Sequence, residues 1–177
     1  YETAFGYDPS GNLISQTDKE SNTTRYVYDK LNRLEKVIDP AGGETTYSYD
    51  ARNNLITLTD ANGGTTRFEY DKNNRLVKQI RPMDQETNYG YDPAGNLIEK
   101  IDAKNQKTEY EYDAANRLVR IRRYDSADHQ NPVKTVDFDY DPAGNLTGCS
   151  DGITSAAYSY DNRSEERRVG KECATGC

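Results

Sequence analysis

The sequence lacks tryptophan and has only one histidine, one methionine and three cysteines in 177 residues. Only 33% of the residues are hydrophobic, and no apolar run approaches the roughly 20 residues that a membrane helix needs. The formal net charge is -7, and lysine and arginine are mixed with acidic residues along the chain. Because neutralising phosphates requires clustered basic residues, we expect no nucleic-acid partner. Because the chain has no sufficiently long apolar run, we expect no membrane span.

The few reactive residues form no pattern that is typical of catalysis. His129 has no second ligand or nucleophile at a recognisable spacing, so we expect a solvated loop histidine. Cys149 has no nearby histidine signature and is expected to be a packed or surface thiol. Aspartate is abundant, which raises the question of calcium, but the Gly-Gly-x-Gly-x-Asp pattern of calcium β-rolls is missing. We therefore expect no enzyme, no catalytic residue, no cofactor and no metal site.

What the sequence does contain is a repeated tyrosine-aspartate pair. The first six copies are spaced by 21 residues, and the last two intervals are 28 and 20 residues. A fixed period of this length indicates a repeat architecture, in which one supersecondary unit stacks on the next. The tyrosines of these pairs are Tyr7, Tyr28, Tyr49, Tyr70, Tyr91, Tyr112, Tyr140 and Tyr160.

Each tyrosine ends a segment with the periodicity of a β-strand. Another aromatic residue lies two positions earlier, as Tyr26 and Phe68 do, and a threonine often lies four positions earlier, as Thr24 and Thr66 do. A spacing of two places these side chains on one face of a strand. The positions between them are mostly polar or small, so we expect one packed face and one solvated face.

The residues after each tyrosine predict a tight turn. Aspartate always follows, proline comes next in several copies, and the fourth position is glycine or asparagine in the first seven copies. This combination describes a type I turn that is closed by a bulge residue with positive φ. The predicted positive-φ residues are Gly11, Asn32, Asn53, Asn74, Gly95, Asn116 and Gly144.

A leucine six residues after the tyrosine opens a second strand, as Leu34 and Leu76 do. A second turn of the same chemistry follows, for example at residues 39–42 and 60–63. Each repeat is therefore predicted to hold two strands of about five residues and two turns. The extra residues before Tyr140, from Tyr124 to Pro132, predict an elongated surface loop, with a functional insertion as the alternative.

The repeat pattern stops close to Arg163. Residues 163–173 read RSEERRVGKEC, which resembles the translation of a common sequencing-adapter oligonucleotide, and Ser164 and Glu166 replace the expected Gly or Asn and Leu. We interpret residues 1–162 as a repeat array from a larger protein and residues 163–177 as a non-native tail without defined packing; a native charged tail is the alternative. Without the tail only Cys149 remains, so no disulfide framework is predicted.

The pattern aromatic-x-Tyr-Asp-x-x-Gly/Asn-Asn/Arg-Leu resembles the Rhs or YD-repeat family, over residues 1–162. Relatives include Rhs polymorphic toxins, wall-associated repeat proteins, shell subunits of insecticidal toxin complexes and teneurins. The resemblance implies an all-β fold in which tandem antiparallel β-hairpins of about 21 residues form an elongated, curved sheet, a fragment of a hollow β-cocoon. The short Asp-Pro-x-Gly motifs share letters with the family's self-cleavage signature, but each lies at a repeat turn, so we assign them no cleavage role.

Two functions follow as expectations. The first is a structural shell segment that encapsulates a C-terminal toxin or effector domain, with the remainder of the same polypeptide as its partner. The alternative is a cell-surface adhesin module that binds glycans or proteins. The family resemblance implies a secreted or cell-surface location, and a hydrolase or transferase is disfavoured because no pair of nucleophile and base is present.

Overall fold

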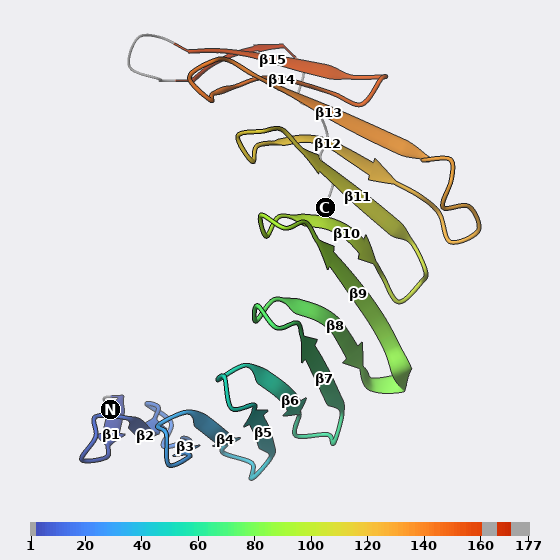
Figure 1. Ribbon diagram of the computed structural model, residues 1–177. Helices are drawn as coiled ribbons and strands as arrows, with labels where there is room; N and C mark the ends of the chain where they lie inside the picture. The colour runs from blue at the N-terminus through green and yellow to red at the C-terminus, as the bar shows by residue number, and fades with distance from the viewer. Residues whose placement is uncertain (1–2, 161–165, 171–177) are drawn as a thin grey trace. The chain divides into compact units, whose positions relative to one another are not determined.

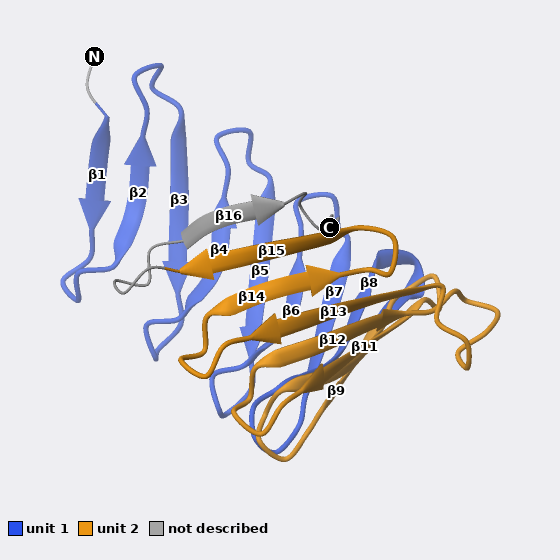
Figure 2. Cartoon of the chain, turned by 90° about the horizontal axis from the view of Figure 1, so that it is seen from above, with its two compact units in different colours: residues 1–86 blue, residues 87–177 orange. Residues whose placement is uncertain are grey.

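In the computed structural model the chain is all-β, and within each part of it consecutive strands pair as antiparallel neighbours (Figure 1). The structure describes residues 3–160 and, for residues 166–170, the course of the backbone only. The chain divides into two compact units, residues 1–86 and 87–177, which Figure 2 colours separately. Among the described residues, no helix is long and apolar enough to cross a membrane.

Unit 1 is a sheet in which sequence order is also spatial order, because each strand turns back onto the next. A single 3-10 turn, η1 (Pro82–Asp84), follows its last complete strand. The strands are β1 (Ala4–Tyr7), β2 (Leu13–Thr17), β3 (Thr23–Tyr28), β4 (Leu34–Ile38), β5 (Glu44–Tyr49), β6 (Leu55–Thr59), β7 (Thr65–Tyr70) and β8 (Leu76–Arg81).

Unit 2 repeats the same arrangement, and the boundary between the units falls within its first strand. A long connection, residues 124–133, separates β12 from β13, as the elongated loop of the sequence predicts. The strands are β9 (Gln85–Tyr91), β10 (Leu97–Ile101), β11 (Lys107–Tyr112), β12 (Leu118–Arg123), β13 (Lys134–Tyr140), β14 (Leu146–Ser150), β15 (Ser155–Tyr160) and β16 (Glu166–Gly170).

A β-bulge sets the register of the tyrosine-containing hairpins from β1–β2 to β13–β14. In the β3–β4 hairpin, Tyr28 lies opposite Leu34, but Val27 lies opposite Lys36, so one residue is inserted in β4. The same shift occurs in the β1–β2, β5–β6, β7–β8, β11–β12 and β13–β14 hairpins. Directly opposed residues share a face of the sheet. The bulge therefore places Ile38, which lies opposite Arg25, on the face away from Tyr28.

The aromatic face is half-buried and does not form a closed core. Among the described residues only Thr87, Tyr124, Val136, Cys149 and Ala156 are buried, and none of these side chains is less than 2% exposed. The reason is that the strands of each unit form a single sheet, so a side chain is covered only by its neighbours along that sheet. The sequence correctly predicts which face is more protected, but the expected packing of that face is looser than in a layered domain.

The end of the chain contributes one further strand. The backbone of β16 pairs with β15, with Tyr160 opposite Glu166. Only the backbone of these five residues is described, so the expectation that the tail lacks defined packing against the sheet stays a prediction. Residues 161–165 and 171–177 lie outside the described residues. A free strand edge pairs through main-chain groups with almost any extended segment, so this pairing does not bear on the origin of the tail.

Candidate functional site

The predicted site residues all lie in the turn that joins the two strands of a repeat or at the end of the strand before it. The eight tyrosines are the last residues of β1, β3, β5, β7, β9, β11, β13 and β15. The seven glycines and asparagines have positive φ, as predicted. The angles are 86° at Gly11, 59° at Asn32, 67° at Asn53, 60° at Asn74, 98° at Gly95, 59° at Asn116 and 92° at Gly144.

The aspartate of each turn organises the backbone around its carboxylate. At Asp8, the main-chain N–H of Ser10 and that of Asn12 both donate to Oδ1 over 2.9 Å, and Asn12 Nδ2 donates to Oδ2 over 2.8 Å. The Asp8 carbonyl accepts the N–H of Gly11 over 3.0 Å, which closes the type I turn. One side chain therefore satisfies three donors that a tight turn would otherwise leave to solvent.

These hydrogen bonds hold the pKa of the turn carboxyls below their usual range. Donation from the side-chain amide of the asparagine four residues later is the largest cause of the lowered pKa of Asp8 and Asp50. In turns with arginine at that position, such as those of Asp29 and Asp113, the backbone N–H of the arginine is the largest cause. The turn carboxylates are therefore ionised acceptors at neutral pH and are already occupied.

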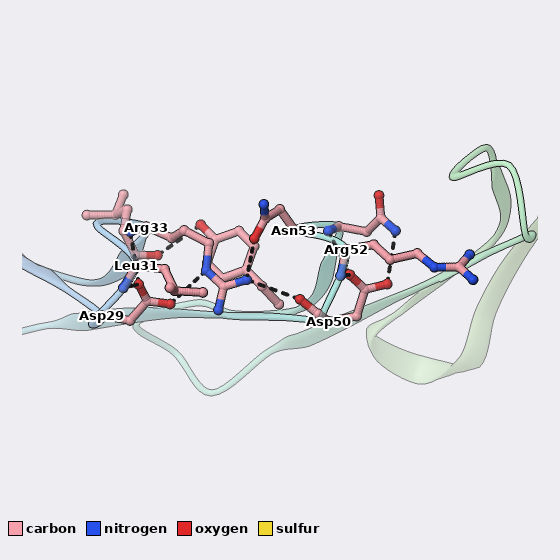
Figure 3. Close-up of polar contacts among 9 residues, drawn as sticks. Asp29, Leu31, Arg33, Asp50, Arg52 and Asn53 are labelled. Carbon is pink, nitrogen blue, oxygen red and sulfur yellow. Dashed lines mark hydrogen bonds and ion pairs between the residues drawn. The ribbon is translucent and has the colours of Figure 1, made fainter.

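A second set of contacts joins each turn to the turn of the next repeat. Arg33 Nη1 donates to Asn53 Oδ1 over 2.9 Å and to the carbonyl oxygen of Asp50 over 3.1 Å (Figure 3). Arg33 Nε binds Oδ2 of its own turn aspartate, Asp29, over 2.7 Å. One guanidinium thus connects two consecutive turns with its fork of donors.

Asparagine at the same position makes the shorter version of this link. Asn12 Nδ2 donates to Asn32 Oδ1 over 3.0 Å, so the positive-φ asparagine of the next repeat is the acceptor. The same contact recurs from Asn54 to Asn74 over 3.0 Å and from Asn96 to Asn116 over 2.9 Å. The positive-φ asparagines therefore have two roles: they adopt the turn conformation and they accept the link from the preceding repeat.

The longer arginine does not need that side-chain acceptor. Arg117 Nη1 donates to the Asp141 carbonyl over 3.1 Å, and the positive-φ residue of that turn is Gly144. We call the linking position, five residues after each tyrosine, the ladder position. Along the sequence it alternates between asparagine and arginine: Asn12, Arg33, Asn54, Arg75, Asn96, Arg117 and Asn145.

The tyrosines also connect neighbouring hairpins. Tyr28 Oη donates to the carbonyl oxygen of Leu13, in the preceding repeat, over 3.0 Å. Ladder arginines cover the next tyrosine ring, with Arg33 4.7 Å from the Tyr49 centroid and Arg117 4.9 Å from the Tyr140 centroid. The Tyr–Leu bond recurs at Tyr49–Leu34 (2.9 Å), Tyr70–Leu55 (3.0 Å), Tyr140–Leu118 (2.9 Å) and Tyr160–Leu146 (2.7 Å).

The lone histidine and the buried cysteine have structural surroundings. His129 is half-buried in the long loop, and its Nε2 lies 2.8 Å from the carbonyl oxygen of Asn105 in the neighbouring turn. Asn105 Nδ2 in turn donates to the Ser126 carbonyl over 3.0 Å, so the loop is fastened to that turn. Cys149 is a free, buried thiol in β14. His129, which we expected to be solvated, is therefore partly buried and lies against the turn of Asn105.

A polar network beside the long loop joins Lys107, Glu109 and Tyr124. Tyr124 Oη donates to Glu109 Oε2 over 2.5 Å, and Lys107 Nζ lies 2.8 Å from Glu109 Oε1 and 4.3 Å from the Tyr124 ring centroid. Burial raises the pKa of Tyr124, and its bond to Glu109 adds to the shift. Lys107 and Tyr124 border a pocket of about 510 Å³ that Val133 also lines, but the polar groups of both residues are engaged with Glu109. Among the described residues, no group of three or more His, Cys, Asp or Glu side chains could hold a metal ion.

The arrangement defines a class of protein: tandem β-hairpin repeats held side by side through their turns and tyrosines. The model of the RHS Repeat family matches residues 7–44, 36–65, 49–83 and 91–129. These segments cover more than half of the chain, which therefore belongs to the RHS repeat family and is a structural repeat segment. None of the curated proteins compared with the chain matches it.

Solved structures show the same fold in much longer chains. The crystal structure of TcdB2-TccC3 without its hypervariable C-terminal region matches with a TM-score of 0.76 and 23% identity, over 94% of this chain and 10% of that one. The Tc holotoxin pore of Photorhabdus luminescens, carrying a TccC3 mutation, matches with a TM-score of 0.73 and 23% identity, again over 94% and 10%. At this identity the likeness shows the fold alone, and this chain spans only a tenth of the length of those proteins.

Proposed function

We propose that this chain is a wall segment of a hollow β-shell that encloses a C-terminal toxin or effector domain of the same polypeptide. The observation that carries this proposal is the way in which the sheet is held together. Tyr–Leu, Asn–Asn and Arg–carbonyl links join consecutive repeats, while few side chains within residues 3–160 are buried. Such a sheet gains stability by extension along its strand order, as a wall does, and not by folding around a core.

The fold likeness supports the same interpretation. The similar structures are parts of named toxin complexes, and one of them is described as lacking a hypervariable C-terminal region. For this chain we propose further repeats and a C-terminal effector as its covalent partners, and a secreted or cell-surface location. We also propose that the chain has no catalytic role, since its turn carboxylates serve as acceptors for backbone and ladder donors.

Protease protection of the parent protein tests encapsulation. In the intact protein the C-terminal domain should resist an added protease that digests the same domain when it is expressed alone. A matched pair of wall variants provides the control: Gly95→Val places a branched side chain at a φ of 98°, whereas Ala94→Val alters the adjacent exposed residue of the same turn. We expect faster cargo digestion only in Gly95→Val.

Equal digestion of the cargo in the intact protein and as a free domain would exclude encapsulation. The adhesin alternative would then gain weight if the isolated chain bound a glycan array in a saturable manner. Detection of hydrolase or transferase activity in the purified chain would contradict the proposed absence of a catalytic role.

A further inference from the structure

The pocket of about 510 Å³ in unit 2 lies where the long connection between β12 and β13, residues 124–133, meets β10, β11 and β12 (Figure 1). Its volume is typical of sites for small organic ligands. Two hydrogen bonds fasten the connection to the neighbouring turn, one between His129 Nε2 and the Asn105 carbonyl and one from Asn105 Nδ2 to the Ser126 carbonyl. The loop side of the pocket is therefore held in place by the chain itself.

Half-buried side chains of the aromatic face form the strand side of the pocket. Lys100 lies opposite Thr108, and Thr108 lies opposite Arg123, so the three residues form a row across β10, β11 and β12. Tyr110, two residues after Thr108, lies opposite Ile121 on the same face. A row with two cations therefore borders a row of apolar surface.

The repeat pattern does not account for either cation. Lys100 lies nine residues after its repeat tyrosine, and it is the only charged residue at that position in the first seven repeats. Arg123 lies eleven residues after its tyrosine, where five of these seven repeats have the aspartate of the second turn. The other exception is Arg81, but there the residue in the place of Lys100 is Leu58. The two cations come together in one row only at this pocket.

The two carboxylates that line the pocket are held by their own turns. Asp102 and Asp125 each accept two main-chain N–H groups at Oδ1, over 2.8–2.9 Å. Within residues 3–160, Lys100 forms no ion pair. Burial raises the pKa of Tyr110, and the positive charge of Arg123 opposes that shift, so the field of the guanidinium reaches the Tyr110 hydroxyl. The strand side of the pocket therefore favours negative charge.

We propose that this pocket binds a small organic anion, a carboxylate or a phosphate ester carried on a planar apolar body. The charged group lies between Lys100 and Arg123, where the guanidinium fork can donate to two oxygens and the ammonium adds a point charge. The planar body lies against Tyr110 and Ile121, with Val133 at its side. This binding is separate from the proposed wall function, which rests on the tyrosine and ladder links.

A chemical-shift titration of the full 177-residue chain, labelled with ¹⁵N and kept under reducing conditions, tests the proposal. The probes share one ring system: naphthoate is an anion, naphthamide is its neutral counterpart, and naphthyl phosphate carries a phosphate ester. We expect saturable shifts confined to residues 100–110 and 121–133, with naphthoate bound about fivefold more tightly than naphthamide. The tighter binder of naphthoate and naphthyl phosphate identifies which of the two anionic groups the pocket prefers.

Substitutions in the cationic row locate the charged group. Lys100→Gln introduces the residue that Gln16 and Gln79 already place at the equivalent position, so the sheet should fold unchanged. It should weaken naphthoate about fivefold and leave naphthamide unaffected, and Arg123→Gln should do the same. The matched control is Arg81→Gln, which removes the same charge at the equivalent position of another repeat and should leave both affinities unchanged. The dispersion of the same spectra shows whether each variant is folded.

Equal affinity for naphthoate and naphthamide would overturn the proposal, because the cations would then contribute nothing to binding. So would equal weakening by Lys100→Gln and Arg81→Gln, which would reflect net charge alone. Shifts spread over the aromatic faces of both units would show general stacking on tyrosines in place of a pocket. A lack of saturable shifts with both naphthoate and naphthyl phosphate would exclude the site.

Discussion

Replacing Asn74 with glycine should weaken the sheet more than the same replacement at Asn53. The two asparagines have nearly the same backbone, with φ of 60° and 67°, and each accepts one ladder hydrogen bond. Glycine adopts positive φ without strain, and its effect on the unfolded chain is the same at both positions. The comparison therefore isolates the link between repeats.

The expected difference follows from what each donor retains. After Asn53→Gly, Arg33 still donates to the Asp50 carbonyl and still covers the Tyr49 ring. After Asn74→Gly, Asn54 Nδ2 retains only the carboxylate of its own turn, 2.9 Å away, and the link to the next repeat is lost. Each change removes one exposed hydrogen bond, worth about 0.5–1 kcal/mol net, but only Asn53→Gly leaves the donor with a second acceptor in the next turn, so Asn74→Gly should be the more destabilising change by at most about that amount.

A double-mutant cycle makes this test specific. Asn54→Arg should have little effect in the unaltered chain but should recover most of the loss in the Asn74→Gly background, because arginine can reach the Asp71 carbonyl as Arg33 reaches that of Asp50. The measurement is a urea titration followed by tyrosine fluorescence, which no tryptophan obscures. Equal destabilisation by the two glycine variants, together with an additive effect of Asn54→Arg, would refute the ladder mechanism.

Three further predictions concern the tyrosines, the turns and the turn carboxylates. Tyr70→Phe should lower the free energy of unfolding by about 1 kcal/mol, because the hydrogen bond to the Leu55 carbonyl is lost. Tyr70→Ala should lower it by about 2–3 kcal/mol, because the ring is half-buried. A urea titration in which Tyr70→Ala is as stable as the unaltered chain would contradict this. Gly95→Val should lower the free energy of unfolding by at least about 1–2 kcal/mol, and Ala94→Val should not. A Cβ at Gly95 meets no atom within 4 Å, so a lower melting temperature of Gly95→Val alone would reflect backbone strain and not a steric clash. The pKa of the turn aspartates is lower in the folded chain, so the stability that they contribute is present above their unfolded pKa near 4 and is lost as the pH falls through the lower folded values. Acid titration should therefore unfold the sheet below about pH 4. An unchanged melting temperature in that range would contradict the role of these carboxylates.

The strands and first turns could be predicted from the sequence because each depends on local chemistry. Tyrosine with an aromatic residue two positions earlier specifies a strand face, and the following aspartate with Gly or Asn specifies the turn, as the φ of Asn74 and Gly95 shows. Local rules fail where the second turn departs from the pattern. Ser21, with a φ of 69°, takes a position that usually requires glycine or asparagine, and the turn at Pro82–Asp84 is a 3-10 turn with Met83 at a φ of 65°.

The links between repeats could not be predicted from one repeat considered alone. The alternation of Asn12, Arg33 and Asn54 is visible in the sequence, but its meaning depends on how far each side chain reaches across a strand pair. The bulge opposite Tyr28 likewise changes which residues of β4 share the aromatic face, and simple alternation gives no sign of it. The degree of burial was also beyond the pattern, because hydrophobic periodicity indicates a protected face but not whether a second layer covers it.

The stability of each junction therefore depends on its two neighbours and very little on the rest of the chain. Tyr28 bonds to the preceding repeat through Leu13, while the turn of Asp29 is tied to the following one through Arg33. A repeat inside a unit is therefore held on both sides, by its tyrosine on one side and by its ladder residue on the other. Because these links are made only between adjacent repeats, a change at one ladder position should weaken the junction to the next repeat and leave more distant junctions intact.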